Sequence, residues 1–134
     1  MERKRILIVE DDDTTRELMR MTLERHGYKV VEAENGIEGF DTLVREPVDL
    51  VITDINMPAT DGAHLVRRVR GTPEMAHTPI LVVTGYGTGS ASLTLAQGAD
   101  AYEPKPIDPH RLIASVRRIL NEDGAAAKRS ALVE

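Results

Sequence analysis

Strand-like and helical patterns alternate along almost the whole chain, and this alternation limits the possible folds more than any other feature. Runs of apolar, mostly β-branched residues predict five strands, at 6–9, 28–33, 48–53, 78–84 and 99–103. Helical spacing of apolar residues predicts five helices, at 14–26, 35–44, 62–70, 89–97 and 109–120. Because a helix follows each strand, the strands are expected to run parallel with helices on both faces. The sequence therefore predicts an α/β fold.

Apolar spacing also indicates which face of each helix is buried. In the first two helices the residues expected to face the core are Leu18, Met19 and Leu23, then Ile37, Phe40, Leu43 and Val44. Asp108 is expected to cap the last helix, with Pro109 at its first position. Residues 122–134 lose this spacing, so we expect one domain over 1–121 and a C-terminal tail that is frayed or partly helical.

The composition argues against several classes of function. The chain has 134 residues and no cysteine, which excludes disulfides, thiolate metal sites and cysteine nucleophiles and is compatible with a cytoplasmic location. No apolar run is long enough to cross a membrane. A net charge of −5, with no tryptophan and one phenylalanine, argues against nucleic-acid binding. Met1 and the short tail favour a stand-alone protein or an N-terminal domain cut from a longer one.

Polar residues follow the predicted strands where ligands bind in parallel sheets, at the carboxyl ends. Glu10 and Asp11 follow the first strand, Asp54 ends the third, Thr84 ends the fourth, and Lys105 follows the fifth. Oxygen ligands without histidine or cysteine favour a hard cation, Mg²⁺ or Mn²⁺. Thr84 and Lys105 are predicted to have nothing to hold until a tetrahedral oxyanion binds. A neighbouring acid, Asp13, is expected to cap the first helix.

Four stretches of the sequence carry a family resemblance. "ILIVEDDDTTREL", "DLVITDINMPATDG", "ILVVTGYG" and "GADAYEPKP" resemble, in this order, the signature motifs of the response-regulator receiver domain, over roughly residues 4–121. The resemblance implies a flavodoxin-like, doubly wound sheet of strand order 2-1-3-4-5 with five helices. It also implies a cis bond between Lys105 and Pro106. Pro104 departs from the family pattern, so the fifth strand is expected to end early at an edge.

The resemblance also assigns roles to single residues. Asp54 corresponds to the phosphoacceptor, Glu10 and Asp11 to the acidic pair that holds the metal, and Asn56 to a backbone carbonyl ligand. Lys105 corresponds to the phosphate-binding lysine, Thr84 to the switch hydroxyl and Tyr102 to the switch aromatic. Asn56 and Tyr86 occupy positions that set the lifetime of the phosphorylated state in this family.

The implied function is a phosphoacceptor in a two-component phosphorelay. A sensor histidine kinase or a histidine phosphotransfer protein would supply the phosphoryl group, and slow autophosphatase chemistry would remove it. The switch would then change binding to a downstream protein, or to a second copy, through the fourth helix, fifth strand and fifth helix. The sequence names neither the kinase nor the target.

Two other functions fit parts of the same pattern. Asp11, Asp13 and Thr15 satisfy the D-x-D-x-T motif of haloacid-dehalogenase-like phosphatases, in which Asp11 would be the nucleophile. That assignment leaves Asp54 unexplained and lacks a second acidic pair after Lys105. A receiver fold that serves only for docking and is never phosphorylated is the other alternative, and the complete five-residue set argues against it.

Overall fold

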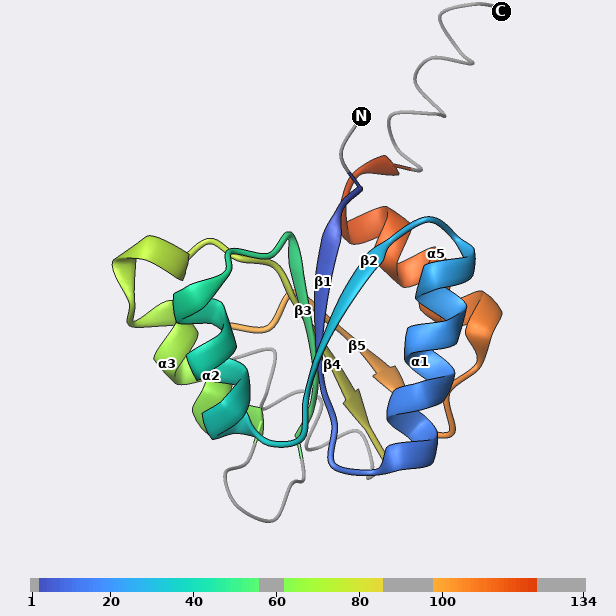
Figure 1. The fold of residues 1–134 in the computed structure, drawn as a ribbon, viewed down its shortest axis with the longest axis horizontal. Coiled ribbons are helices and arrows are strands. Elements are labelled where there is room, and N and C mark those ends of the chain that lie inside the picture. The colour runs from blue at the N-terminus through green and yellow to red at the C-terminus, as the bar shows by residue number, and fades with distance from the viewer. Residues whose placement is uncertain (1–2, 56–61, 86–97, 123–134) are drawn as a thin grey trace, which may run out of the picture.

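The computed structural model describes residues 3–55, 62–85 and 98–122. Five parallel strands form one sheet, in the order β2-β1-β3-β4-β5, as predicted (Figure 1). The strands are β1 (Arg5–Val9), β2 (Lys29–Ala33), β3 (Leu50–Asp54), β4 (Ile80–Thr84) and β5 (Ala101–Pro104). The helices are α1 (Asp13–Arg25), α2 (Gly36–Arg45), α3 (Gly62–Arg70) and α5 (Pro109–Ile119), with a 3₁₀ turn η1 (Pro73–Met75). The helix predicted at 89–97 lies outside the described residues.

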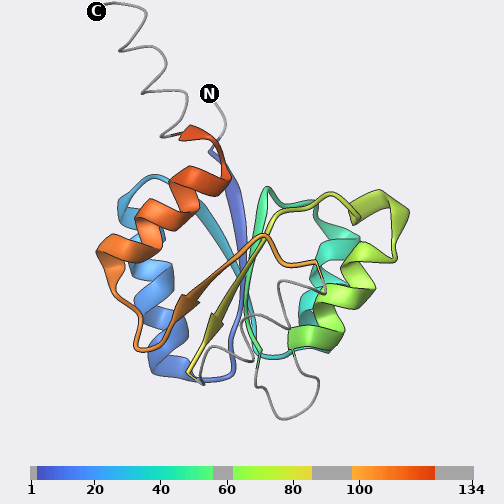
Figure 2. The ribbon, with the colours of Figure 1, turned by 180° about the vertical axis from the view of Figure 1, so that it is seen from behind.

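The helices cover both faces of the sheet, so the fold has three layers. Figures 1 and 2 show α2 and α3 on one face and α1 and α5 on the other. Strands β3 and β4 are buried at every position, and β1 at all but its first residue, as expected for strands covered on both faces. Alternate residues of β1 supply the two cores: Leu7 and Val9 pack toward α2 and α3, and Ile6 and Ile8 toward α1 and α5.

Strand β5 differs from the other strands because it lies at the edge of the sheet. Its residues alternate between half-buried and exposed, and the strand ends at Pro104, which pairs with Thr84 of β4. Proline has no N–H to donate, and an edge position tolerates this. The peptide bond between Lys105 and Pro106 is cis, as expected. Asp108 caps α5 by accepting a hydrogen bond from the N–H of His110, also as predicted.

The buried face of α2 is only partly the predicted one: Leu43 is buried and Phe40 packs against the core, as expected. Ile37 and Val44 leave 52% and 64% of their surface exposed, whereas Gly36, Gly39, Thr42 and Leu43 are buried. The cause is a close approach at Gly39: a Cβ there would lie 2.8 Å from Cγ2 of Val9, so the glycine lets α2 settle directly on β1. The buried face of α2 is therefore rotated from the predicted one toward Gly36 and Gly39. In α1, Leu18 is likewise more exposed than predicted, at 39%, while Met19 and Leu23 are buried.

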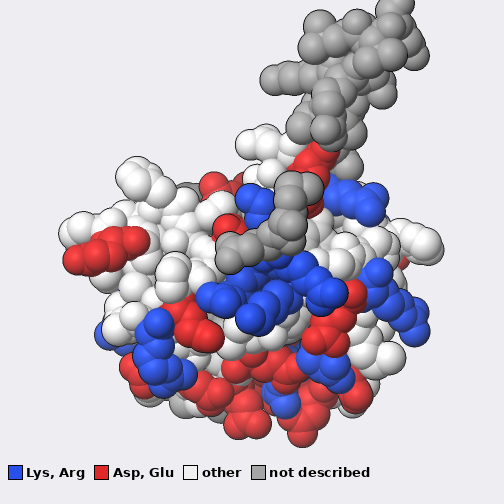
Figure 3. Space-filling view, turned by 45° about the horizontal axis from the view of Figure 1, so that its top comes forward, with Lys and Arg blue, Asp and Glu red and all other residues white. Residues whose placement is uncertain are grey.

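Charge is divided between the two ends of the sheet. Arg3, Arg5 and Lys29 surround a hollow at the amino-terminal edge, next to the start of the chain. Figure 3 shows Lys and Arg side chains gathered in this region and Asp and Glu side chains gathered lower in the view. The carboxyl edge, where β1 and β3 end, carries Glu10, Asp11 and Asp54.

Candidate metal and phosphoryl site

The three predicted acidic residues meet at the carboxyl edge of the sheet. β1 and β3 are neighbours, so Glu10 and Asp11, just after β1, lie beside Asp54 at the end of β3. One carboxylate oxygen from each lies within 4.8 Å of the others. Glu10 and Asp54 are 0% and 4% exposed, whereas Asp11 is exposed. The sequence thus predicted this cluster correctly.

Glu10 is held at four points. Its N–H donates to the carbonyl of Ala33 at 3.0 Å, its own carbonyl accepts from Arg16 at 2.7 Å, and its Oε2 accepts from the N–H of Asp12 at 3.0 Å. Its Oε1 is buried, lies 2.8 Å from Nζ of Lys105 and has no hydrogen bond of good geometry. A buried carboxylate oxygen that is poorly satisfied in this way has capacity left for another ligand.

Lys105 lies between two of the acids. Its Nζ is 2.8 Å from Oε1 of Glu10 and 2.9 Å from Oδ2 of Asp54. The prediction that Lys105 has nothing to hold before an oxyanion binds is therefore wrong, because both buried carboxylates need a cation nearby. Burial raises the pKa of Glu10, although the ion pair with Lys105 and the hydrogen bond from Asp12 oppose the rise. Burial works against the charge on Lys105, but its ion pairs with Glu10 and Asp54 outweigh that effect and its pKa is raised.

The donor set fits a hard divalent cation. All three ligands are carboxylates, and one lysine does not offset three negative charges at this spacing. Mg²⁺ takes oxygen ligands and needs only a few protein carboxylates, because water completes its shell. The cluster can therefore hold such an ion, through Glu10, Asp11 and Asp54. Asn56, the predicted carbonyl ligand, lies outside the described residues.

The next two acids of the loop serve the start of α1. Asp12 is the N-cap: its carboxylate accepts from the N–H of Thr15 at 2.8 Å and from its hydroxyl at 2.6 Å. These bonds from Thr15 lower the pKa of Asp12. The cap was predicted one residue later, at Asp13, which instead is the first helical residue and pairs with Arg16. Asp13 and Thr15 of the D-x-D-x-T pattern are thus engaged in local contacts.

Thr84 and Tyr102 lie on the same face of the sheet. Thr84 pairs with Pro104 and Val82 pairs with Tyr102, and residues two apart on a strand point to one side. Thr84 is 2% exposed, whereas Tyr102 is 36% exposed. The N–H of Lys105 donates to the carbonyl of Thr84 at 2.8 Å, which ties the site lysine to β4. Tyr86, the second predicted lifetime residue, lies outside the described residues.

Arg16 contacts this site, although the sequence motifs assigned it no role. Its side chain is 12% exposed, and it reaches from α1 to the carbonyl of Glu10. The one signal in the sequence is an arginine in the first turn of a helix, where the helix dipole disfavours a cation.

None of the described helices is long and apolar enough to cross a membrane.

Comparison with known proteins agrees with the geometry. The family model for the response regulator receiver domain matches residues 6–117. The response regulator MprA of Mycobacterium tuberculosis is 38% identical over 117 residues, which are 87% of this chain and 50% of MprA. MprA of Mycolicibacterium vanbaalenii is 38% identical over 126 residues, or 90% of this chain and 54% of that protein. The chain therefore spans about half the length of the curated relatives it matches.

Two solved structures share the fold over 99% of their own length. A protein described as a response regulator from Chloroflexus aurantiacus superimposes with a TM-score of 0.85 at 36% identity, covering 90% of this chain and 99% of that one. The chemotaxis protein CheY4 of Vibrio cholerae superimposes with a TM-score of 0.83 at 29% identity, covering 88% of this chain and 99% of that one.

Proposed function

The chain belongs to the response regulator receiver domain family, and we propose that Asp54 accepts a phosphoryl group from a phosphohistidine of its partner kinase or of a histidine phosphotransfer protein. A receiver domain of two-component signal transduction implies a kinase partner in general. The assignment of Asp54 as the acceptor rests on one observation: it is the only carboxylate in the cluster that is both buried at a strand end and bonded to Lys105 through a hydrogen bond of good geometry.

The transfer needs an in-line attack. One Oδ of Asp54 forms a bond to phosphorus while the bond from phosphorus to the histidine nitrogen breaks, and its electron pair stays on that nitrogen. A divalent cation held by Glu10, Asp11 and Asp54 would neutralise charge on the phosphoryl oxygens. Lys105, already 2.9 Å from Oδ2 of Asp54, donates to a second phosphoryl oxygen. Water later hydrolyses the acyl phosphate and returns the free carboxylate.

Phosphorylation is proposed to act through Thr84 and Tyr102. The hydroxyl of Thr84 donates to a phosphoryl oxygen, and its movement leaves room on the shared face of the sheet for Tyr102 to turn inward. Tyr102 stands on the edge strand beside α5, with its side chain on the opposite face of the sheet from α5, so the change alters the surface at the β5 edge that borders α5. A downstream protein or a second copy of the chain would bind this surface, at a site that includes the helix predicted at 89–97.

Incubation with acetyl phosphate and Mg²⁺, followed by intact-protein mass spectrometry, tests the proposal. The wild type should gain the mass of one phosphoryl group. It should gain none when a chelator of Mg²⁺ is present during the incubation. The Asp54→Asn variant should gain nothing. Asp12→Asn is the matched control: it removes a charge from the same edge, and asparagine caps a helix as well as aspartate does. Phosphorylation of Asp54→Asn at the wild-type level would overturn the assignment.

A further inference from the structure

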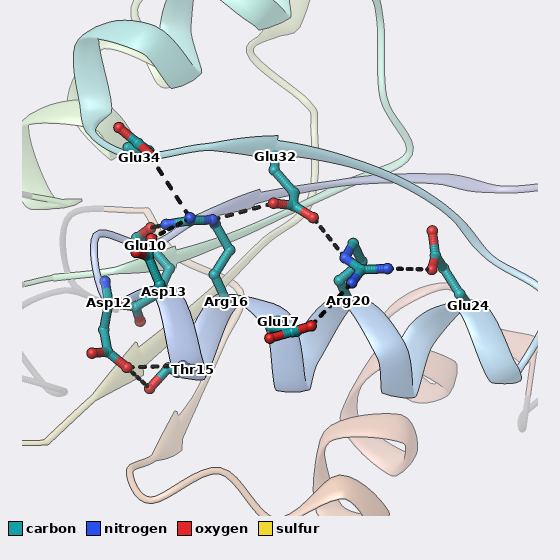
Figure 4. A network of polar contacts seen from close by, with 10 residues as sticks. All are labelled: Glu10, Asp12, Asp13, Thr15, Arg16, Glu17, Arg20, Glu24, Glu32 and Glu34. Carbon is teal, nitrogen blue, oxygen red and sulfur yellow. Dashed lines mark hydrogen bonds and ion pairs between the residues drawn. The ribbon is translucent and has the colours of Figure 1, made fainter.

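A single arginine joins three segments around the metal-binding loop. Figure 4 shows the side chain of Arg16 between the β1–α1 loop, strand β2 and the residues that follow β2. Its Nη1 donates to the carbonyl of Glu10 at 2.7 Å, and its Nε pairs with Glu32 at 3.2 Å. Its Nη2 pairs with Asp13 at 2.5 Å and lies 3.9 Å from Glu34. Each of the three nitrogens of the guanidinium group thus has a hydrogen-bond or ion-pair partner.

The contact with the Glu10 carbonyl matters because of the peptide bond it belongs to. That carbonyl is part of the peptide unit between Glu10 and Asp11, the acidic pair of the site. The N–H of Glu10 is already bonded to Ala33, so Arg16 provides the second fixed point of the same backbone stretch. Asp11 is exposed, and its side chain makes no hydrogen bond or ion pair with the described residues. Its direction therefore depends on the backbone that Arg16 holds.

Helix stability alone does not explain Arg16, although its pair with Asp13 lies within α1. The residue lies in the first turn of α1, where a cation opposes the helix dipole. Arg20, one turn later, shows the ordinary use of a helical arginine: it pairs with Glu17 and Glu24 on its own helix and with Glu32 of β2 (Figure 4). Both arginines contact three carboxylates, but the hydrogen bond to the metal-binding loop belongs to Arg16.

We propose that Arg16 is a positioning residue for the metal site, which fixes the Glu10–Asp11 peptide so that both carboxylates face Asp54. The inference rests on the proposed metal and phosphoryl site. It requires the planar guanidinium, because a lysine ammonium cannot reach the Glu10 carbonyl, Asp13 and Glu32 in one fixed geometry. The charge of Arg16 is balanced by the acids around it, so its effect on the metal is mainly geometric.

Two substitutions separate geometry from charge. In Arg16→Gln the positive charge is lost, and a purely electrostatic role predicts tighter Mg²⁺ binding because a like charge leaves the region. A positioning role predicts the opposite sign, weaker binding by about tenfold, which is the usual loss when a partner that orients metal ligands is removed. Arg16→Lys keeps the charge and should also weaken binding, whereas a purely electrostatic role predicts no change.

Isothermal titration calorimetry with Mg²⁺ alone, below the melting temperature of every variant, measures the effect. Arg20→Gln is the matched control, because it loses the same number of ion-pair partners from the same helix and should bind Mg²⁺ as the wild type does. A second readout is the rate of phosphorylation by acetyl phosphate: the Mg²⁺ concentration for half-maximal rate should rise in Arg16→Lys, and the rate at saturating Mg²⁺ should recover.

The outcomes distinguish this inference from the proposed function. If the wild type binds Mg²⁺ and Asp11→Asn does not, but both Arg16 variants bind as the wild type does, the positioning role is wrong and the metal site stands. Equal weakening in Arg20→Gln and Arg16→Gln would also overturn it, because the effect would then follow from general loss of ion pairs. A wild-type protein that binds no Mg²⁺ would overturn both proposals.

Discussion

The two buried acids of the site, Glu10 and Asp54, and the proposed switch residue Tyr102 stand on differently constrained parts of the sheet, while Thr84 is buried at the end of β4. Glu10 follows β1 and Asp54 ends β3, two strands covered on both faces, and every polar group of Glu10 has a neighbour. Tyr102 stands on the edge strand, which pairs on one side only and alternates between half-buried and exposed positions. We call Glu10, Asp11 and Asp54 the metal half, and Thr84 and Tyr102 the switch half. Lys105 touches both halves.

This difference suits the two tasks. A metal and an in-line attack need ligands whose positions are fixed before the reaction, and burial among bonded neighbours provides this for Glu10 and Asp54. A switch needs a side chain with two positions of similar free energy, and a tyrosine at the edge of a sheet can have an exposed and a buried one. Substitutions in the metal half should therefore change binding and stability, and substitutions in the switch half should change transmission.

The largest effect is expected from Lys105→Met. The substitution leaves the buried carboxylates of Glu10 and Asp54 without their shared cation. The free energy of unfolding without metal should fall by about 3 kcal/mol, at the lower end of the range for breaking a buried ion pair, because 22% of the lysine side chain is exposed to water. Added Mg²⁺ should recover part of the loss. Urea denaturation with and without Mg²⁺ measures both.

Lys29→Met is the control for this experiment. Lys29 is exposed at the opposite edge of the sheet and has no ion pair among the described residues. Its loss should change stability by less than about 0.5 kcal/mol. If Lys105→Met were as stable as Lys29→Met, the metal half would not depend on its lysine, and the contrast between the two edges would fail.

The next largest effect is expected from Asp11→Asn. Asp11 is exposed, so the variant should keep its stability but lose at least about 1.4 kcal/mol of Mg²⁺ binding, or tenfold in affinity. Asp12→Asn is the control: it removes the same charge from the next residue, which caps α1. Calorimetric titration should show a change for Asp11→Asn alone. A larger effect from Asp12→Asn would mean that the metal ligands are assigned one residue too early.

Thr84→Ala tests the switch half. The variant should still be phosphorylated at Asp54, because the metal half is intact, but it should transmit the change poorly to β5. A tenfold preference of a partner for the phosphorylated state needs about 1.4 kcal/mol, and this coupling should be largely lost. NMR shifts of residues 98–104 on phosphorylation report it. If these shifts changed as fully as in the wild type, Thr84 would not be the switch.

The smallest effect is expected from Glu10→Gln as a function of pH. Burial raises the pKa of Glu10 above its usual 4.5, so between 4.5 and the raised pKa the folded protein binds more protons than the unfolded chain. Stability without metal therefore falls as pH rises through this window. Glu10→Gln lacks this dependence. Its unfolding free energy relative to that of the wild type should therefore increase as the pH rises toward neutral. Parallel stability curves for the two proteins would contradict the raised pKa.

The sequence was sufficient for the fold because the alternation of strands and helices indicates a parallel α/β sheet and the family resemblance implies its strand order. It was sufficient for the cluster because parallel strands bring their carboxyl ends together. It was insufficient for contacts that depend on a second element. The rotated face of α2 follows from the approach of Gly39 to Val9, which the spacing of Ile37 and Val44 does not show.

The prediction of the N-cap of α1 was wrong for a related reason. Asp12 and Asp13 are equally good caps by residue type, and the choice depends on where β1 ends and on the bond from the N–H of Asp12 to Glu10. The pairing of Lys105 with both Glu10 and Asp54 was also missed, because the sequence shows that these groups converge but not which of them touch.

The most direct test of the central claim is to locate the acyl phosphate. Protein phosphorylated by acetyl phosphate is treated with sodium borohydride, which reduces an aspartyl phosphate to homoserine, then digested with trypsin and sequenced by mass spectrometry. The account predicts homoserine at position 54, in the peptide spanning residues 46–67. Homoserine at position 11, in the peptide spanning residues 6–16, would contradict it and favour the phosphatase-like assignment.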